Sequence, residues 1–463
     1  MSKQKQSFER CSFQYSDRMS FSMVQVALIF AGMSINQDVQ AQSPIDGLLA
    51  NNPGLDTTQT SMARVIEVAC PNQTNEIQFQ TRCNALVRAL QRSGESNTPL
   101  DQAGAVNGMQ QASPEQIPSQ GVSATRSSFQ MIGGRLAALR AGSRGFQIAG
   151  LGNFPLPINL ASVSDPIGGA AGDDADTWSR LGGFVNGSFN TGEVGAEANQ
   201  FGYNFNNGSI NFGVDYRLLD ELVIGTAFTY MRSESGFANN GGSLDSNHYT
   251  GAIYGTYNPT DNLYFDAIAS FGGLNYDTSR HIQYSVPGDI VNTDAKGTSG
   301  GNQYSVSLGT GYNYATGQWL LNPYAKVNYI KLDVDGFSET GGNGWGMQFA
   351  DQSVESVTTT LGSQIAYTAS MSWGVLMPNV HGEWHHQYKD GSRNIAVRLL
   401  GDTTSGLSFD TVTTAPDRNY FTVGTGVSGT FAHGFSAFFN YDALVGYRNV
   451  DSHMFTLGTR IEF

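Results

Sequence analysis

The final residues of the chain alternate between apolar and polar side chains. One face of this segment carries Phe455, Leu457, Ile461 and Phe463, with Thr459 among them. The other face carries Thr456, Gly458, Arg460 and Glu462. Successive side chains of a β-strand point to opposite faces, so the pattern predicts a strand with one apolar and one polar wall. After a long series of similar strands, this is typical of a membrane β-barrel, whose apolar wall meets lipid and whose polar wall meets a wet lumen.

Twelve strand-like runs occupy the chain from Trp178 onward. They lie at residues 178–189, 209–217, 222–231, 247–257, 263–275, 303–314, 319–333, 354–369, 373–388, 417–431, 435–448 and 452–463. The long connections between them are residues 190–208, 232–246, 276–302, 334–353 and 389–416. Short turns on one rim and long loops on the other are the layout of an outer-membrane barrel. We therefore expect an all-β fold, a twelve-stranded antiparallel outer-membrane β-barrel over residues 178–463; a large soluble β-sandwich is the alternative.

Composition also favours a membrane protein built from strands. Hydrophobic residues make up 40% of the chain and the mean hydropathy is −0.26, which excludes a helical membrane bundle. The 56 glycines and 11% aromatic residues fit tight turns and interfacial girdles of aromatic side chains. The net charge of −14 argues against nucleic acid as a partner, because such binding relies on Lys and Arg meeting phosphates.

Residues 1–41 are predicted to be an export signal. Arg18 precedes a short apolar core at residues 24–33, and Val39-Gln40-Ala41 follows as an A-x-A-like cleavage site. The apolar core is too short to cross a bilayer as a helix, which needs about 20 residues. A buried N-terminal helix is the alternative.

Residues 42–112 are expected to form a short helical, passenger-like region. Apolar residues recur at helical spacing in residues 61–69 and 79–90, and residues 92–112 have the composition of a loose linker. Cys70 and Cys83 form an even pair in an exported chain, so a disulfide between them is the default. Two free thiols that bind metal are the alternative, but no second Cys pair or His lies nearby.

Residues 113–177 are expected to contain a helix that stands inside the barrel. Ser113-Pro114-Glu115-Gln116 is a helix-start pattern, Pro118 interrupts it, and a longer helix is predicted from about Ser123 to Ala141. One stripe of that helix carries Phe129, Ile132, Leu136 and Leu139, and Arg126, Arg135 and Arg140 lie off it. A helix of this length spans about 28 Å, the thickness of a membrane core, yet it is too polar for lipid.

The arginines of this helix need partners, because a buried unpaired charge costs several kcal/mol. Polar faces of the predicted strands offer four candidate carboxylates: Asp266, Glu383, Asp442 and Glu462. We expect the arginines to lie near these acids and the apolar stripe to pack against stretches of wall rich in Gly and Ala.

The remaining candidates for chemistry favour a non-enzymatic protein. His381, Glu383 and His385 share one face of a strand, but residues i and i+4 are about 13 Å apart, too far to ligate one ion together. Residues 289–294 form an acid-rich segment, predicted to be a loop, without the ordered spacing of a calcium site. We therefore expect no metal, no cofactor and no catalytic residue, and interpret the His-Glu-His group as polar lumen wall.

Residues 178–463 resemble the translocator barrel of the autotransporter family, which performs type V secretion. The resemblance is carried by residues 455–463, by Phe435-Ser436-Ala437-Phe438-Phe439-Asn440-Tyr441-Asp442 and by residues 424–429. Residues 130–142, with Arg135-Leu136-Ala137-Ala138-Leu139-Arg140, look like the family's pore-threading helix. Residues 42–112 depart from the family, because they lack the β-helical repeats of typical passengers.

The resemblance implies a protein of the bacterial outer membrane, exported through the periplasm, that supports export or display of what lies N-terminal to its barrel. It implies outer-membrane lipid and the barrel assembly machinery as partners, a monomeric barrel, and an assembly signal at Phe455, Ile461 and Phe463. A non-secreting structural or adhesive barrel that acts through its extracellular loops is the alternative.

Overall fold

The computed structural model describes residues 57–70, 77–96, 116–140, 145–147, 180–197, 201–286, 288–431 and 435–461. The predicted export signal, the start pattern at residues 113–115, and the residues Glu462 and Phe463 lie outside these ranges.

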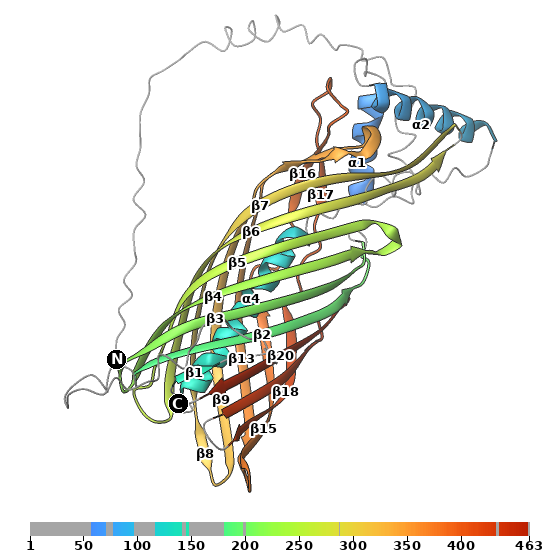
Figure 1. Ribbon diagram of the computed structural model, residues 1–463. Coiled ribbons are helices and arrows are strands. Elements are labelled where there is room, and N and C mark those ends of the chain that lie inside the picture. Colours follow the sequence, from blue (N-terminus) through green and yellow to red (C-terminus); the bar gives the residue numbers. More distant parts are fainter. Residues whose placement is uncertain are drawn as a thin grey trace, which may run out of the picture. The chain divides into compact units, whose positions relative to one another are not determined.

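A closed antiparallel barrel of twelve long strands dominates the described chain, as predicted (Figure 1). Its strands are β2 Leu181–Val194, β3 Tyr203–Leu219, β4 Leu222–Phe237, β5 Gly242–Tyr257, β6 Leu263–Val286, β7 Asp289–Tyr312, β9 Trp319–Val334, β13 Gln352–Tyr367, β15 Gly374–Gln387, β18 Asn419–Phe431, β19 Phe435–Val445 and β20 Val450–Ile461. The barrel closes where β2 pairs with β20, from Asn186 opposite Gly458 to Val194 opposite Val450. A short strand, β1 Gly145–Gln147, pairs with both at this seam.

The wall alternates as a membrane barrel requires. In β7, Gln303, Ser305 and Ser307 are buried on the inside, whereas Tyr304, Val306 and Leu308 are exposed on the outside. Other strands add exposed apolar side chains to this outer surface, among them Phe212, Phe228, Ile253, Phe271, Val327 and Val423. No helix among the described residues is long and apolar enough to span a bilayer.

Two of the predicted long loops, residues 232–246 and 276–302, are wrong. Strands β4 and β5 continue to a tight turn at η3 Ala238–Asn240, and β6 and β7 each run for 24 residues. Apolar side chains become sparse on the outward face of these segments because a strand that has left the bilayer needs no lipid-facing side chains. Its backbone pairing continues all the same, from Leu263 opposite Tyr312 to Val286 opposite Asp289.

The loops predicted at residues 334–353 and 389–416 contain further strands. They are β10 Phe337–Ser338, β11 Thr340–Gly341, β12 Met347–Phe349, β16 Asn394–Leu399 and β17 Phe409–Val412, with the 3₁₀ turn η4 Gly342–Gly344. Strands β10, β12, β16 and β17 form a separate four-stranded sheet, which we call the outer sheet. At the opposite end of the barrel the connections are short and include β8 Tyr314–Thr316 and β14 Ala369–Met371. We call these two ends of the barrel the outer end and the inner end.

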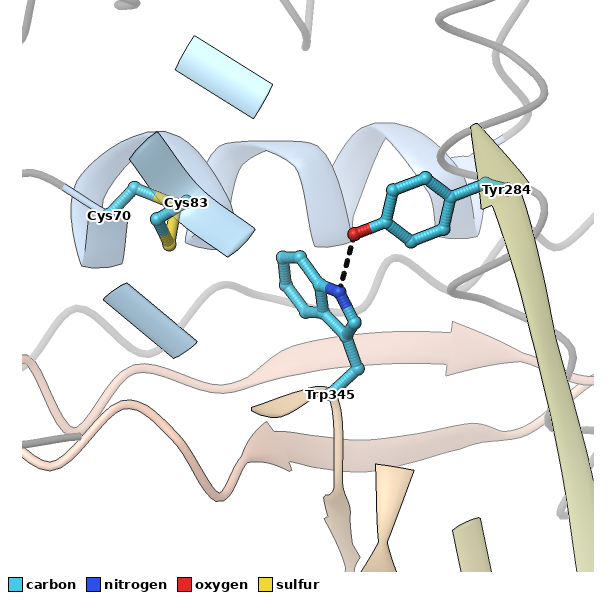
Figure 2. The surroundings of a disulfide bond; sticks show 4 residues. All are labelled: Cys70, Cys83, Tyr284 and Trp345. Atoms are coloured by element: carbon cyan, nitrogen blue, oxygen red, sulfur yellow. Dashed lines mark hydrogen bonds between the residues drawn. A yellow bond between two sulfur atoms is a disulfide. The ribbon is translucent and has the colours of Figure 1, made fainter. Parts of the chain in front are cut away.

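Two helices, α1 Thr57–Ala69 and α2 Ile77–Ser96, precede the barrel and are longer than predicted. A disulfide joins Cys70, after α1, to Cys83, in α2, with a Cα–Cα distance of 5.2 Å (Figure 2). We call these helices and their disulfide the α1–α2 unit.

Helix α4 Gln116–Arg140 lies within the barrel as one continuous helix (Figure 1). The interruption predicted at Pro118 is wrong. Pro118 is the third residue of the helix, where a backbone N–H has no intrahelical acceptor, so the proline removes no helical hydrogen bond.

Candidate functional site: the barrel lumen and its helix

The apolar stripe of α4 packs against one side of the barrel wall. Phe129, Ile132, Leu136 and Leu139 are all buried there. Their cluster on the wall comprises Phe184, Val223, Ala227, Ala252, Tyr254, Ile268 and Ile330, from strands β2, β4, β5, β6 and β9. The wall therefore receives the helix through aliphatic and aromatic side chains as well as the small residues that the sequence suggested.

Arg135 is the deepest charge of the helix. Its Nε lies 2.7 Å from Asp215 Oδ2 and its Nη2 lies 2.9 Å from Asp215 Oδ1, so the pair is bidentate. Tyr254 donates a further hydrogen bond to Asp215 Oδ2 at 2.9 Å, and the Arg135 guanidinium lies 5.7 Å from the centre of the Phe184 ring. Because the charges are paired and bridged by hydrogen bonds, this buried group fixes the helix against β3.

The other two arginines have different surroundings. Arg140 forms an ion pair of 2.6 Å with Asp266 and lies 3.8 Å over the Tyr264 ring. Arg126, near the middle of the helix, lies 5.8 Å over the ring of Tyr420. Asp266 is one of the four carboxylates that we predicted as partners of these arginines, and it forms an ion pair with Arg140.

A polar network covers the wall on the other side of the lumen. Glu383 of β15 accepts hydrogen bonds from Tyr324 Oη at 2.7 Å and Lys326 Nζ at 3.2 Å, both from β9. His385 Nε2 lies 3.3 Å from the second oxygen of Glu383. Tyr324 reaches β15 across the intervening strand β13 at Gly362, where an added Cβ would lie 2.5 Å from the tyrosine ring. The glycine is therefore what allows the bond to form.

A second bridge links this wall to the helix. His381 Nε2 lies 2.7 Å from Asp442 Oδ1, across β18 at Gly424. A Cβ on Gly424 would lie 2.3 Å from His381 Cε1 and 2.4 Å from Asp442 Oδ1, so only glycine fits. Asp442 Oδ2 in turn accepts a hydrogen bond of 2.9 Å from Gln130 Nε2 of α4. The structure thus places His381 and His385 against different carboxylates.

A large cavity lies between this wall and α4, beside the contact of Gln130 with Asp442. Its volume is about 1460 Å³. Its lining is rich in polar side chains, among them Asn322, Lys326, Thr360, Asn379, Glu383 and Asn440. In the part of the chain that the structure describes, no three His, Cys, Asp or Glu side chains are grouped to hold a metal ion. The lumen is therefore divided into an apolar side, where the helix is fixed, and an open polar side.

Several residues of this arrangement were not predicted from the sequence. Asp215 and Tyr254 were not among the candidate partners of the helix, although Asp215 follows the exposed Val214 and so lies on the inward face of its strand. The sequence does carry one signal for the Tyr324–Glu383 and His381–Asp442 contacts. It is the glycine in the interior of each strand that these contacts cross, Gly362 and Gly424. Such glycines often mark the close approach of a neighbouring group.

The predicted assembly signal is described in part. Phe455 faces outward in β20, with 37% of its surface exposed, beside the exposed Leu457. Ile461 ends β20, and Phe463 lies outside the described residues.

Comparison with known proteins places this barrel in context. Residues 183–442 match the family model described as "Autotransporter beta-domain". The chain is 27% identical over 232 residues to "Uncharacterized protein in trpE-trpG intergenic region" of Pseudomonas putida, covering 49% of this chain and 37% of that protein. It is 25% identical over 253 residues to "Outer membrane protein A" of Rickettsia conorii, covering 53% of this chain and 12% of that protein.

One solved structure is also similar to this chain in part. The translocator domain of autotransporter NalP from Neisseria meningitidis aligns with a TM-score of 0.47 and 15% identity, over 66% of this chain and 93% of that one. The chain thus spans little more than a third of the length of the first of the two sequence relatives and much less of the second.

Proposed function

Because the chain belongs to the autotransporter β-domain family, we propose that its barrel exports the α1–α2 unit and displays it at the cell surface. The protein is an outer-membrane translocator barrel of the type V secretion class. The identity of the exported segment, the α1–α2 unit, is the part that we propose. On this view the outer end of the barrel faces the cell exterior and the inner end faces the periplasm.

The course of the chain through the lumen is the observation that carries the proposal. Helix α4 begins in the same core as the α1–α2 unit, because Ile117 is buried there with Tyr276 and Leu332 from the outer parts of β6 and β9. It ends at Arg140, which pairs with Asp266 near the inner end of β6. A chain that crosses the pore in this way connects a unit on one side of the membrane to a barrel strand that starts on the other.

We assign the lumen a mechanical role and no catalytic one. The Arg135–Asp215 pair and the apolar stripe anchor the helix, and the Gln130–Asp442 bond ties it to the opposite wall. We further propose that the barrel is monomeric, that it contacts outer-membrane lipid, and that the barrel assembly machinery inserts it. Phe455, Ile461 and Phe463 are its assembly signal.

The alternative of a non-secreting structural or adhesive barrel draws support from the outer sheet, which gives the outer end a folded surface of its own. Protease treatment of intact cells, followed by mass spectrometry, separates the two. We expect peptides from residues 57–96 to be released from intact cells while a soluble periplasmic protein stays protected. If those peptides appear only after the outer membrane is permeabilised, the alternative holds.

A further inference from the structure

We propose that the outer sheet, residues 339–346 and 400–408 that join its strands, and the β6–β7 hairpin form a docking surface that holds the α1–α2 unit at the cell surface even when the chain between α2 and α4 is cut. This inference rests on the proposed function. It adds that the unit is retained by contacts, independently of its covalent link to the barrel.

A shared apolar core is the first argument. Met62, Ile66 and Leu86 of the α1–α2 unit are fully buried, and the core that buries them includes side chains of the docking surface. Those side chains are Ile282, Tyr284, Val291, Trp345, Met347, Ile395, Val397, Leu399 and Phe409. Two short helices cannot bury a core of their own, so their apolar faces depend on the barrel's extension.

A pocket shaped for one aromatic ring is the second argument. Phe79 of α2 has no exposed surface and meets the ring of Trp345 edge-on, with centroids 5.3 Å apart. A Cβ on Gly401 would lie 2.5 Å from Phe79 Cγ, and one on Gly344 would lie 2.9 Å from Phe79 N. The two glycines leave the space that the phenylalanine occupies.

The far side of this pocket is held rigid by polar contacts. Trp345 Nε1 donates a hydrogen bond of 2.7 Å to Tyr284 Oη, as Figure 2 shows. Arg280 pairs with both oxygens of Glu339 and donates to the Trp345 carbonyl at 2.7 Å. A buried aromatic residue set between fixed partners is the usual form of an interface hot spot.

Polar contacts between the two parts fix the orientation of the unit. Arg82 of α2 forms an ion pair with Asp289 at the start of β7. The backbone N–H of Val412, at the end of β17, donates to Thr58 Oγ1 of α1 at 3.3 Å. The disulfide is buried in the same core, with Cys70 6% and Cys83 0% exposed, so it sets the relative position of the helices that these contacts need.

The test uses the full chain with a site for a specific protease inserted within residues 97–112 and an epitope tag inserted between residues 42 and 56. Intact cells are treated with the protease and washed, and the tag is measured in the cell pellet and the supernatant. We expect the cut unit to stay with the pellet. Release of the cut unit from the otherwise unchanged protein overturns the inference and leaves the proposed export intact.

A chain that is cut in detergent-solubilised membranes but stays uncut in intact cells overturns the proposed function and the inference together. The experiment therefore distinguishes a failure of retention from a failure of export.

Variants of the docking surface leave the unit itself unchanged. In Gly401→Leu the new side chain occupies the Phe79 pocket, and we expect the cut unit to leave the cells at least about tenfold faster. Gly391→Leu is the matched control, because a Cβ there meets nothing within 4 Å. On helix α2, Phe79→Ala is the test variant and Ile77→Ala is its control, because the Ile77 side chain is 77% exposed. Equal retention in Gly401→Leu and Gly391→Leu, with folded barrel in both, contradicts the assigned surface.

Discussion

Arg135 of α4 and Asp215 of β3 form a two-point ion pair whose side chains are 0% and 3% exposed. The residues are 80 positions apart in the chain, so the pair joins the helix to the barrel wall directly. Two charges so far from water stabilise the protein only as long as both are present.

Removing the carboxylate charge should therefore destabilise the barrel. In Asp215→Asn the guanidinium of Arg135 stays buried without its counter-charge, and we expect a loss of about 3–5 kcal/mol in the free energy of unfolding. The measurement is the temperature at which the folded barrel loses its shifted mobility on gels. Asp261→Asn is the control, because Asp261 is exposed in a turn between β5 and β6. Equal unfolding temperatures for the two variants would show that the pair does not anchor the helix.

Bridges across strands should be sensitive to the glycines beneath them. Gly424→Ala places a methyl group where His381 and Asp442 meet, and we expect a cost of about 1–3 kcal/mol for the overpacking. The displaced Asp442 also loses its contact with Gln130 of α4. Gly382→Ala is the control on the neighbouring strand, because an added Cβ there meets nothing within 4 Å.

The same gel assay distinguishes these glycine variants. A lowered unfolding temperature in Gly424→Ala and an unchanged one in Gly382→Ala is the expected result. If both variants unfold like the unaltered protein, the His381–Asp442 bridge has no part in holding the wall.

The barrel was predictable from the sequence wherever lipid imposes a pattern. Val306 and Leu308 alternate with Ser305 and Ser307 because one face of β7 meets lipid and the other meets water. Beyond the bilayer the outward face of a strand meets water instead of lipid, so the lipid-facing part of the pattern ends although the hydrogen bonds do not. The outer parts of β6 and β7 therefore looked like a loop in the sequence.

Partners inside the lumen were less predictable, because they depend on how the helix is turned and which residues of each strand face it. Composition indicated that the arginines need carboxylates, and Arg140 does meet Asp266. Nothing local distinguishes Asp215 as the partner of Arg135, because that contact follows from the rotation of α4 and the register of β3. The docking surface was hidden for the same reason, since its apolar side chains come from segments that are distant in the sequence and meet only in the fold.

Helix α4 is expected to limit flow through the pore, and its removal tests the arrangement of the whole lumen. The apolar side of the lumen is filled by Phe129, Ile132, Leu136 and Leu139, and the polar side already holds a cavity of about 1460 Å³. Deleting residues 113–145 joins the two sides into one wider passage. We expect a larger single-channel conductance in planar bilayers than that of the full chain.

The same deletion should lower the unfolding temperature, because Asp215 and Asp266 lose the arginines that neutralise them. Deleting residues 57–96 instead is the control, since it removes the α1–α2 unit and leaves the helix and its ion pairs in place. A rise in conductance after the deletion of 113–145 alone assigns the restriction to α4. If the deletion of 57–96 raises the conductance as much, the α1–α2 unit rather than the helix restricts the pore, and the contacts of α4 with the wall do not serve to close it.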